Sequence, residues 1–517
     1  MPESVKTLLE ARQQVRENMG GKEKIDRIHA RGGFTVRDRI AALVDPGSFF
    51  EEGTFVRSAQ PADRERTPGD GIIGGLARID GRPVTVVGND VTVKGGSDAQ
   101  HAASKLHRLY NQALELGNPF ILLGEAAGSR VPDVLGSESL TRTRGGGMTW
   151  MATRKREIPV ITVIVGRSFG ESSFMAALSD VIIQVQGSVL AVTSPRVIEI
   201  ATSEKITEEE LGGRSVQETI TGQIDLGVDT EKEAFDAVRE ILAFLPSNCN
   251  SRPPRVPDVP APVPDERLRE MVPDDRRRAY DMRRVVRRMA DDGKFLELRP
   301  KMAQSVLTGF ARLGGRSAGI IASQPMRSGG ALTPEACDKM TRFLCLCDAF
   351  NVPVISLADS PGFLVGTRVE QGKLLFKAML VTQALVRMRV PRITVVVRKA
   401  FGLSFFALSG TGTGAVALYA WPAAEIGFMD PDVAANVLYA GELENLEPDE
   451  RSAELLRRAQ TLEAGTNPYG AAVHMGVDEI IDPAETVVVL TDLLERLEGT
   501  SARPAGPGAL SSWPTCW

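Results

Sequence analysis

The sequence predicts an α/β protein built from two copies of one fold, and three observations carry this prediction. Apolar, β-branched runs such as residues 120–123 and 160–165 are short and continuous, which is typical of parallel strands buried on both faces. Glycines cluster directly after these runs, at residues 124–128 and 166–170, where turns would feed the next helix. Finally, the two halves of the chain share sequence blocks, so one fold is expected twice.

The repeated blocks keep both their order and their spacing. Residues 75–82 recur 234 positions later, and residues 118–123 recur 233 positions later. Residues 158–170 recur 232 positions later, so that Gly170 in the first half corresponds to Gly402 in the second. Unrelated strands of similar composition would not preserve order and offset together. The repeat therefore indicates two domains related by internal duplication.

A proline-rich segment separates the two halves. Its proline density excludes helix and central strand and favours a semi-rigid extended linker. We therefore expect a first domain over residues 1–246, a linker over 247–264 and a second domain over 265–517. The second half should carry an insertion between residues 411 and 467, and the tail from residue 499 should be irregular.

Composition narrows the function classes. The 517 residues include 61 Lys plus Arg against 66 Asp plus Glu, a net charge of -5, so no basic excess exists to bind nucleic acid. No apolar run approaches the ~20 residues that a membrane helix needs, and the charged start does not read as a signal peptide. Five scattered cysteines indicate a reducing cytoplasm, and no Cys or His spacing predicts a metal site.

The glycine turns are the candidate catalytic elements. Turns at residues 166–172 and 398–404 each have an earlier partner loop, at residues 124–130 and 359–366. Backbone amides aimed at one point from a turn and its partner would form an oxyanion hole. Two such holes suit a reaction in which two carbonyl oxygens gain charge in turn. The alternative is that these glycines only allow close packing of helix on strand. No Rossmann or Walker-type phosphate motif is present.

Several further motifs follow one another in a fixed order along the chain. They include Arg37–Ile40, Leu43–Phe49, Pro68–Gly71, Gly88–Gly96, Glu209–Gly213, Cys347–Pro353, Pro361–Thr367, Arg398–Gly402 and Tyr419–Glu425. Together they resemble the carboxyltransferase (β) subunits of biotin-dependent acyl-CoA carboxylases of the propionyl-CoA, methylcrotonyl-CoA and long-chain acyl-CoA type. The resemblance runs from about residue 30 to about residue 497.

This resemblance implies two tandem crotonase-like domains of the ClpP/crotonase superfamily. It implies that acyl-CoA binds the first domain and that carboxybiotin, brought by a separate carrier protein, binds the second. The active site would lie where the first domain of one protomer faces the second domain of another, in a homo-oligomer that is usually a hexamer, a trimer of dimers. The partners would be biotin carboxylase and biotin carboxyl carrier subunits. A carboxyl group would move from carboxybiotin to the α or vinylogous carbon through an enolate, without a metal.

Carried onto this chain, the resemblance names three sets of site residues. The catalytic turns, with backbone donors for the two oxyanion holes, are Gly170, Glu171, Gly402 and Leu403. The acyl-CoA side, with cations for the CoA phosphates, is Lys94, Gly128, Ser129, Arg130 and Arg167. The biotin side is Pro361, Gly362 and Phe363.

The catalytic turns depart from the family pattern. Glu171 and Leu403 each stand where the family has a glycine, Ala126–Arg130 replaces Ser-Gly-Gly-Ala-Arg, and the Arg-His-Gly of the biotin side falls on residues 376–378. The backbone donors survive these changes, since only proline lacks an N–H. What changes is the space beside them and the charge that Glu171 adds.

Two alternatives to the transferase therefore stay open. One is a biotin-independent crotonase-type decarboxylase, hydratase or isomerase that uses Glu171, with Glu125 as a possible second group, for proton transfer. The other is a non-catalytic partner subunit of a carboxylase complex. Glu171 could also be structural, turned to solvent or paired with Arg167 or Arg130.

Overall fold

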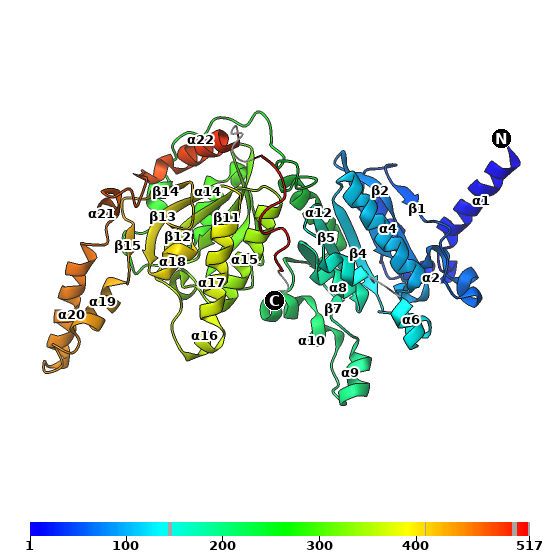
Figure 1. The fold of residues 1–517 in the computed structure, drawn as a ribbon, viewed down its shortest axis with the longest axis horizontal. Helices are drawn as coiled ribbons and strands as arrows, with labels where there is room; N and C mark the ends of the chain where they lie inside the picture. Colours follow the sequence, from blue (N-terminus) through cyan, green and yellow to red (C-terminus); the bar gives the residue numbers. More distant parts are fainter. Residues whose placement is uncertain (143–146, 409, 499–503, 515–517) are drawn as a thin grey trace. The chain divides into compact units, whose positions relative to one another are not determined.

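The computed structural model describes residues 1–142, 147–408, 410–498 and 504–514, and it divides into two compact units (Figure 1). Unit 1 is Met1–Ser251, and unit 2 begins at Arg252. Among the helices of the described residues, none has the length and apolar content to cross a bilayer.

Unit 1 is built on a mixed eight-stranded sheet with the order β1-β2-β3-β4-β5-β6-β8, and β7 pairs with β5. The first three strands are antiparallel, and the pairs from β3 onward are parallel. The strands are β1 (Phe50–Glu52), β2 (Ile72–Ile79), β3 (Arg82–Asn89), β4 (Phe120–Ala126), β5 (Val160–Ser168), β6 (Val181–Val185), β7 (Val189–Leu190) and β8 (Leu226–Val228).

Helices cover this sheet with their apolar faces. The long helix α4 (Gln100–Leu116) lies along β2 and β3 (Figure 1), and it buries Leu106, Leu109 and Tyr110 in the core of the unit. The N-terminal helix α1 (Glu3–Asn18) buries no residue. The other helices are α2 (Lys22–His29), α3 (Val36–Leu43), α5 (Val131–Val134), α6 (Ser137–Arg142), α7 (Gly147–Ala152), α8 (Glu171–Ala177), α9 (Pro195–Thr202), α10 (Glu208–Gly212), α11 (Arg214–Val216) and α12 (Glu231–Phe244).

Unit 2 repeats the sheet strand for strand. Its order is β16-β14-β13-β12-β11-β10-β9, with β15 on β13, which is the order of unit 1 when β9 is equated with β1. The strands are β9 (Phe295–Leu298), β10 (Val306–Leu313), β11 (Arg316–Ser323), β12 (Val354–Ser360), β13 (Arg392–Phe401), β14 (Ala417–Ala420), β15 (Glu425–Gly427) and β16 (Glu479–Ile480). The shared order confirms the predicted α/β fold and its duplication.

The helices of unit 2 follow the same plan, with additions. The insertion expected after residue 411 contains α19 (Pro431–Tyr439) and α20 (Pro448–Glu463), which pack against each other. The tail over residues 504–514 has no helix or strand, but Leu510 is buried and its N–H donates to Asp348 Oδ2 at 2.8 Å. The other helices are α13 (Leu268–Met271), α14 (Met282–Met289), α15 (Pro334–Ala349), α16 (Thr367–Gln371), α17 (Leu374–Arg387), α18 (Leu403–Ala407), α21 (Pro468–Ala472) and α22 (Thr486–Glu498).

The duplication extends to a buried lysine in each unit. Lys105 of α4 and Lys339 of α15 are 6% and 2% exposed. The Lys339 ammonium donates to the carbonyls of Arg299, Met302 and Val306 at 2.9, 3.0 and 2.7 Å. Lys105 likewise donates to three backbone carbonyls, those of residues 53, 69 and 72. Burial lowers the pKa of Lys105 to about 8 and that of Lys339 to about 7. Each lysine ties the segment before the second strand of its sheet to the main helix.

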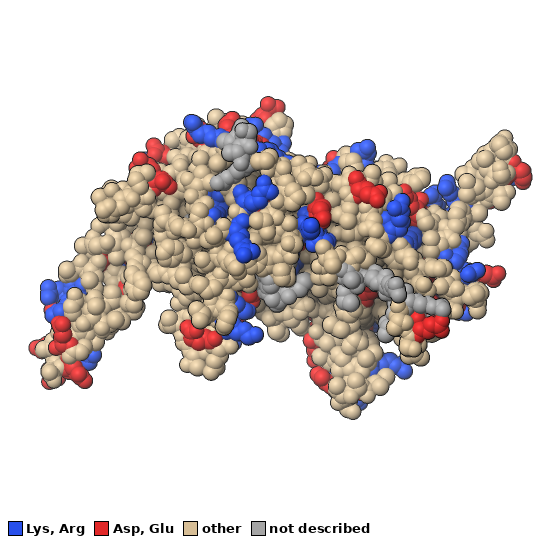
Figure 2. All heavy atoms as spheres, viewed as in Figure 1, with Lys and Arg blue, Asp and Glu red and all other residues tan. Residues whose placement is uncertain are grey.

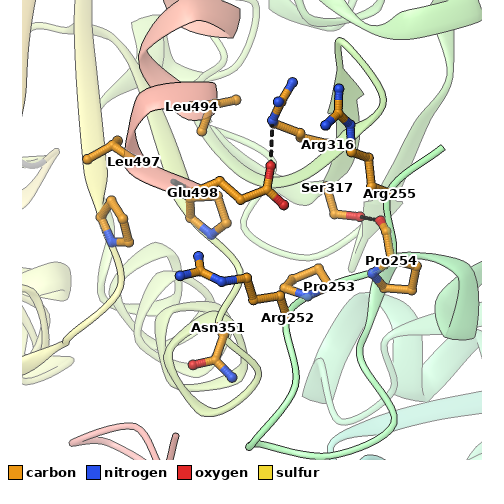
Figure 3. A pocket seen from close by; sticks show the side chains of 12 residues that line it. Arg252, Pro253, Pro254, Arg255, Arg316, Ser317, Asn351, Leu494, Leu497 and Glu498 are labelled. Atoms are coloured by element: carbon orange, nitrogen blue, oxygen red, sulfur yellow. Dashed lines mark hydrogen bonds and ion pairs between the residues drawn. The ribbon is translucent and has the colours of Figure 1, made fainter. Parts of the chain in front are cut away.

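The first part of the proline-rich segment lies on unit 2. The Val256 N–H donates to the Gly315 carbonyl at 2.9 Å, in the turn between β10 and β11. Beside it is a cavity of about 60 Å³ (Figure 3), across which Arg316 Nε donates to Glu498 Oε2 at 2.7 Å. Its lining includes Arg252 and Pro254 and none of the predicted site residues. This cavity therefore lies where the proline-rich segment is attached to unit 2, away from the candidate site.

Candidate active site at the glycine turns

The structure forms the two predicted glycine turns in matching conformations. Gly170 connects β5 to α8 with φ 64° and ψ −132°, and Gly402 connects β13 to α18 with φ 58° and ψ −142°. A positive φ of this kind is open to glycine and strained for other residues. A Cβ on Gly402 would also stand 3.0 Å from the Phe428 carbonyl oxygen, so both backbone and space require glycine here.

The amides of the two glycines do not point at a ligand, which corrects one expectation. The Gly170 N–H donates to the Val192 carbonyl at 3.2 Å, and the Gly402 N–H donates to the Gly427 carbonyl at 2.9 Å. Each amide therefore binds a carbonyl of a later segment of its unit. Glu171 and Leu403 are the first residues of α8 and α18, and a helix does not use its first amides for its own hydrogen bonds. These two amides are the candidate donors at the turns.

In each unit the turn meets its partner loop. Asp98 and Ser129 form a parallel bridge in unit 1, and Leu332 and Phe363 form the same bridge in unit 2. The loop glycine before each bridge has a positive φ, 99° for Gly128 and 134° for Gly362. A Cβ on Gly170 would stand 3.3 Å from Gly128 Cα, so loop and turn are in contact. In unit 1 the turn and its partner loop therefore lie against each other.

In unit 2 the predicted biotin-side residues line one cavity. Pro361, Gly362 and Phe363 lie there together with Gly402 and Leu403, around a volume of about 680 Å³ that is mostly apolar. Much of the rest of the lining comes from α17 and the segment after β15, with Leu374, Leu375, Phe428 and Val433. This volume suits a small organic ligand.

A carboxylate stands at the same irregular point of β4 and of β12. The register of both strands shifts there, at Glu125 and at Asp359. Glu125 forms an ion pair with Arg39, which also binds Glu231. Burial raises the pKa of Glu125, and the Arg39 charge opposes this rise. Glu125, which we considered as a second proton-transfer group, is therefore bound in an ion-pair network.

Asp359 has a similar set of partners in unit 2. The Tyr280 hydroxyl donates to its Oδ2 at 2.8 Å, and Arg398 Nε donates to the same oxygen at 3.1 Å. Burial raises the pKa of Asp359 as well. Tyr280 could not be selected from the sequence, because it lies 79 residues from its partner. This network holds the end of β12, where the loop that lines the cavity begins.

Of the three cations expected for CoA phosphates, one is not accessible. Arg130 is 5% exposed and donates to Asp70 Oδ1 at 2.8 Å, so its charge stabilises a buried carboxylate and does not reach solvent. This corrects its assignment to the CoA site. Arg167 is exposed and pairs with Glu208 at 2.7 Å. Lys94 is partly exposed and pairs with Asp63 at 2.8 Å. Surface pairs of this kind are weak, so both side chains can exchange partners.

The two arginines considered as partners of Glu171 each bind another carboxylate. Arg167 pairs with Glu208, and Arg130 pairs with Asp70. Glu171 is half-buried at the start of α8, and its negative charge contributes to the raised pKa of a residue that sequence reasoning did not select, Asp98.

Within the described ranges no three His, Cys, Asp or Glu side chains gather closely enough to hold a metal ion. On the face in Figure 2, basic and acidic side chains are interspersed within each unit. The glycine turns with their loops are therefore the candidate active site.

Comparisons with known proteins give the chain its family. The family described as carboxyl transferase domain matches residues 27–504. The methylmalonyl-CoA carboxyltransferase 12S subunit of Propionibacterium freudenreichii subsp. shermanii is 36% identical over 95% of this chain and 93% of its own length. The propionyl-CoA carboxylase carboxyltransferase subunit of Haloferax mediterranei is 37% identical over 94% of both chains.

A solved structure agrees with these relatives. Transcarboxylase 12S, a hexamer with methylmalonyl-CoA bound, has a TM-score of 0.89 and 35% identity, and the match covers 97% of this chain and 96% of that one. The resemblance inferred from the motifs is confirmed, and the chain belongs to the carboxyl transferase domain family.

Proposed function

We propose that the chain is the carboxyltransferase subunit of a biotin-dependent acyl-CoA carboxylase, moving a carboxyl group from carboxybiotin to the α or vinylogous carbon of an acyl-CoA. As a member of its family the chain is a carboxyltransferase, and its two units are tandem crotonase-like domains. The observation that supports the proposal best is the matched pair of glycine turns, Gly170 and Gly402. The reaction places negative charge first on the ureido oxygen of biotin and then on the thioester oxygen, and amide donors beside each turn would stabilise one of these charges.

We assign acyl-CoA to unit 1, which contains the first domain expected over residues 1–246. The loop at Gly128 and Ser129 and the turn at Gly170 and Glu171 would face the thioester oxygen. Lys94 and Arg167 would exchange their surface partners for CoA phosphates, because a charge-assisted bond to phosphate is stronger than an exposed ion pair.

We assign carboxybiotin to unit 2, where the domain expected over residues 265–517 lies. The cavity between Pro361–Phe363 and the Gly402 turn is apolar and of suitable volume, and the Leu403 amide stands beside it. The bicyclic ring of biotin is compact and largely apolar, and its ureido oxygen needs a donor. When bound, biotin supplies the carboxyl group; the residues of unit 2 orient the ring and exclude water.

We further propose a homo-oligomer, a hexamer in the form of a trimer of dimers, that works with biotin carboxylase and biotin carboxyl carrier subunits. Large apolar side chains support burial against other copies: Val365, Phe376 and Phe428 are 86%, 78% and 87% exposed. The 12S relative is a hexamer. Cys249, Cys337, Cys345 and Cys347 are buried and not in disulfides, and this supports the proposal of a cytoplasmic location.

The test is a transfer assay on the pure full-length chain. Acetyl-CoA, propionyl-CoA and 3-methylcrotonyl-CoA are each incubated with and without carboxybiotin, and the CoA products are identified by mass. We expect a carboxylated product from at least one thioester, and only when carboxybiotin is present. A product that forms without carboxybiotin, or no product with any thioester, would contradict the proposed function.

A further inference from the structure

Arginines gather around a second cavity of unit 2, at α13 and α14. The cavity has a volume of about 910 Å³, and it shares no lining residue with the cavity at the Gly402 turn. Two of its eleven lining residues are acids, Glu270 and Asp281, and five are arginines. The arginines are Arg267, Arg278, Arg284, Arg287 and Arg288.

The sequence of α14 places three of these arginines on one face of the helix. The apolar residues at positions 282, 285, 286 and 289 are buried in the core of the unit. Arg284, Arg287 and Arg288 are exposed, and their spacing of three and four residues brings them to one side of the helix. The pattern that buries α14 therefore also directs a basic face at the cavity.

The arginines of this segment fall into two groups. Arg276 and Arg283 lie outside the cavity lining, and each binds a carboxylate of unit 2. Arg278, Arg284 and Arg287 line the cavity, and none of the three forms an ion pair with a described residue. The fold thus provides carboxylates for the neighbouring arginines and leaves these three charges without one.

The charges of the cavity do not cancel. Arg288 binds Asp265, which lies outside the lining. With Asp265 counted, five positive charges stand against three negative ones, which leaves an excess of two. A hollow surface lined by one sign of charge concentrates ions of the opposite sign. An anion is therefore the expected ligand.

The backbone that carries Arg278 is held from inside the unit. The buried Arg398 donates from Nη1 to the carbonyls of Asp275 and Arg278 at 3.2 and 2.9 Å. Two residues further on, the Tyr280 hydroxyl donates to Asp359 at 2.8 Å. Because these bonds fix the backbone before a ligand arrives, binding requires less ordering of this wall of the cavity.

The size and the remaining lining of the cavity narrow the class of anion. Its volume is within the about 300–1,000 Å³ of small-molecule sites and exceeds what one phosphate fills. Guanidinium groups bind phosphate oxygens in pairs and stack on flat rings. Met271, Pro273 and Ala279 add apolar surface. A chain of phosphates that carries a flat, partly apolar group matches both parts of the lining.

We propose that this cavity binds a nucleoside polyphosphate. The phosphates contact Arg278, Arg284 and Arg287, and the base packs against Met271 and Pro273. This inference does not depend on the proposed function, because the cavity contains none of the residues assigned to acyl-CoA or biotin. Coenzyme A contains an adenosine with phosphates as well, so a free nucleotide and CoA are tested separately.

The test is isothermal titration calorimetry of the full-length chain with ATP, in EDTA and without biotin. We expect the wild type to bind ATP and the double variant Arg284→Gln/Arg287→Gln to bind it at least about 10²-fold more weakly, because two charge-assisted contacts are lost. The matched control, Arg269→Gln/Arg277→Gln, removes the same charge from exposed positions outside the lining and should keep the wild-type affinity. Arg278→Gln, a change outside α14, should weaken ATP binding about tenfold.

Further titrations identify the part of the ligand that is recognised. AMP, with one phosphate, and tripolyphosphate, without a nucleoside, should both bind more weakly than ATP. Weaker binding of CoA than of ATP would identify a free nucleotide as the ligand. Equal binding of CoA, lost in Arg284→Gln/Arg287→Gln, would identify the nucleotide part of CoA.

Four results would overturn the proposal. They are no binding of ATP by the wild type, unchanged affinity in Arg284→Gln/Arg287→Gln and in Arg278→Gln, an equal loss in the cavity and control variants, and binding of tripolyphosphate as tight as that of ATP. Thermal unfolding checks that each variant is folded. If the double variant does not fold, Arg278→Gln decides, because it leaves α14 unchanged.

Discussion

The Leu403 amide can be removed without removing the helix that carries it. Leu403 is the first residue of α18, a position where proline is tolerated because its missing N–H has no partner inside the helix. Proline restricts the residue before it to extended conformations. Gly402, at φ 58° and ψ −142°, has the mirror image of that conformation, which is open to glycine alone. The structure therefore accommodates Leu403→Pro locally.

We expect Leu403→Pro to reduce kcat for carboxyl transfer by about 10²–10³-fold, which corresponds to about 2.7–4 kcal/mol of lost oxyanion stabilisation. The Gly402 amide cannot compensate, because it is bound to the Gly427 carbonyl at 2.9 Å. The assay measures kcat and KM with carboxybiotin and propionyl-CoA. Leu403→Ala is the control, since it shortens the side chain and keeps the amide.

Two results would refute this reasoning. Wild-type kcat in Leu403→Pro would show that the amide does not stabilise the transition state. Equal losses in Leu403→Pro and Leu403→Ala would show that the side chain, and not the amide, matters at this turn. Thermal unfolding of both variants checks that α18 still forms.

Three further predictions follow from other parts of the structure. Because burial lowers the pKa of Lys339 from 10.5 to about 7, the unfolded chain binds more protons than the folded one between these values. The contribution of this lysine to stability should therefore rise with pH across that window, and urea unfolding of Lys339→Met should lose this part of the pH dependence. Arg130→Met should destabilise unit 1 by about 3–5 kcal/mol, because it leaves the buried Asp70 carboxylate without its ion-pair partner. Arg167→Met should mainly raise KM for acyl-CoA. Unfolding curves measure the first effect, and steady-state kinetics measure the second. Replacing Phe376 and Phe428 together by Asp should lower the mass measured by light scattering, and an unchanged mass would exclude this face from the assembly.

Much of the fold could be predicted from the sequence because the two halves of the chain repeat the same motifs. The block ending at Gly170 and the block ending at Gly402 locate the same turn, and the structure gives both glycines the same backbone conformation. Local sequence dictates such features, since a positive φ selects glycine. The Pro361–Phe363 loop was located for the same reason.

Side-chain partners at long range could not be predicted. The partner of Arg130 is 60 residues away in the chain, so an arginine beside a glycine loop could equally have faced solvent. The hydrogen bond from the Gly170 N–H to the Val192 carbonyl also depends on where a later segment of the chain folds back. A signal for Asp98 did exist, because the offset of the repeat places it opposite Leu332, and an acid aligned with a buried leucine is unusual.

The buried lysines provide an internal measure of unfolding for each unit. An amine is modified by acylating reagents only when it is exposed and uncharged, and the ammonium groups of Lys105 and Lys339 are enclosed by backbone carbonyls. Labelling of either lysine would therefore record the opening of its own unit. Mass spectrometry of two peptides, one per unit, would give two unfolding rates from one sample, without probes that alter the chain.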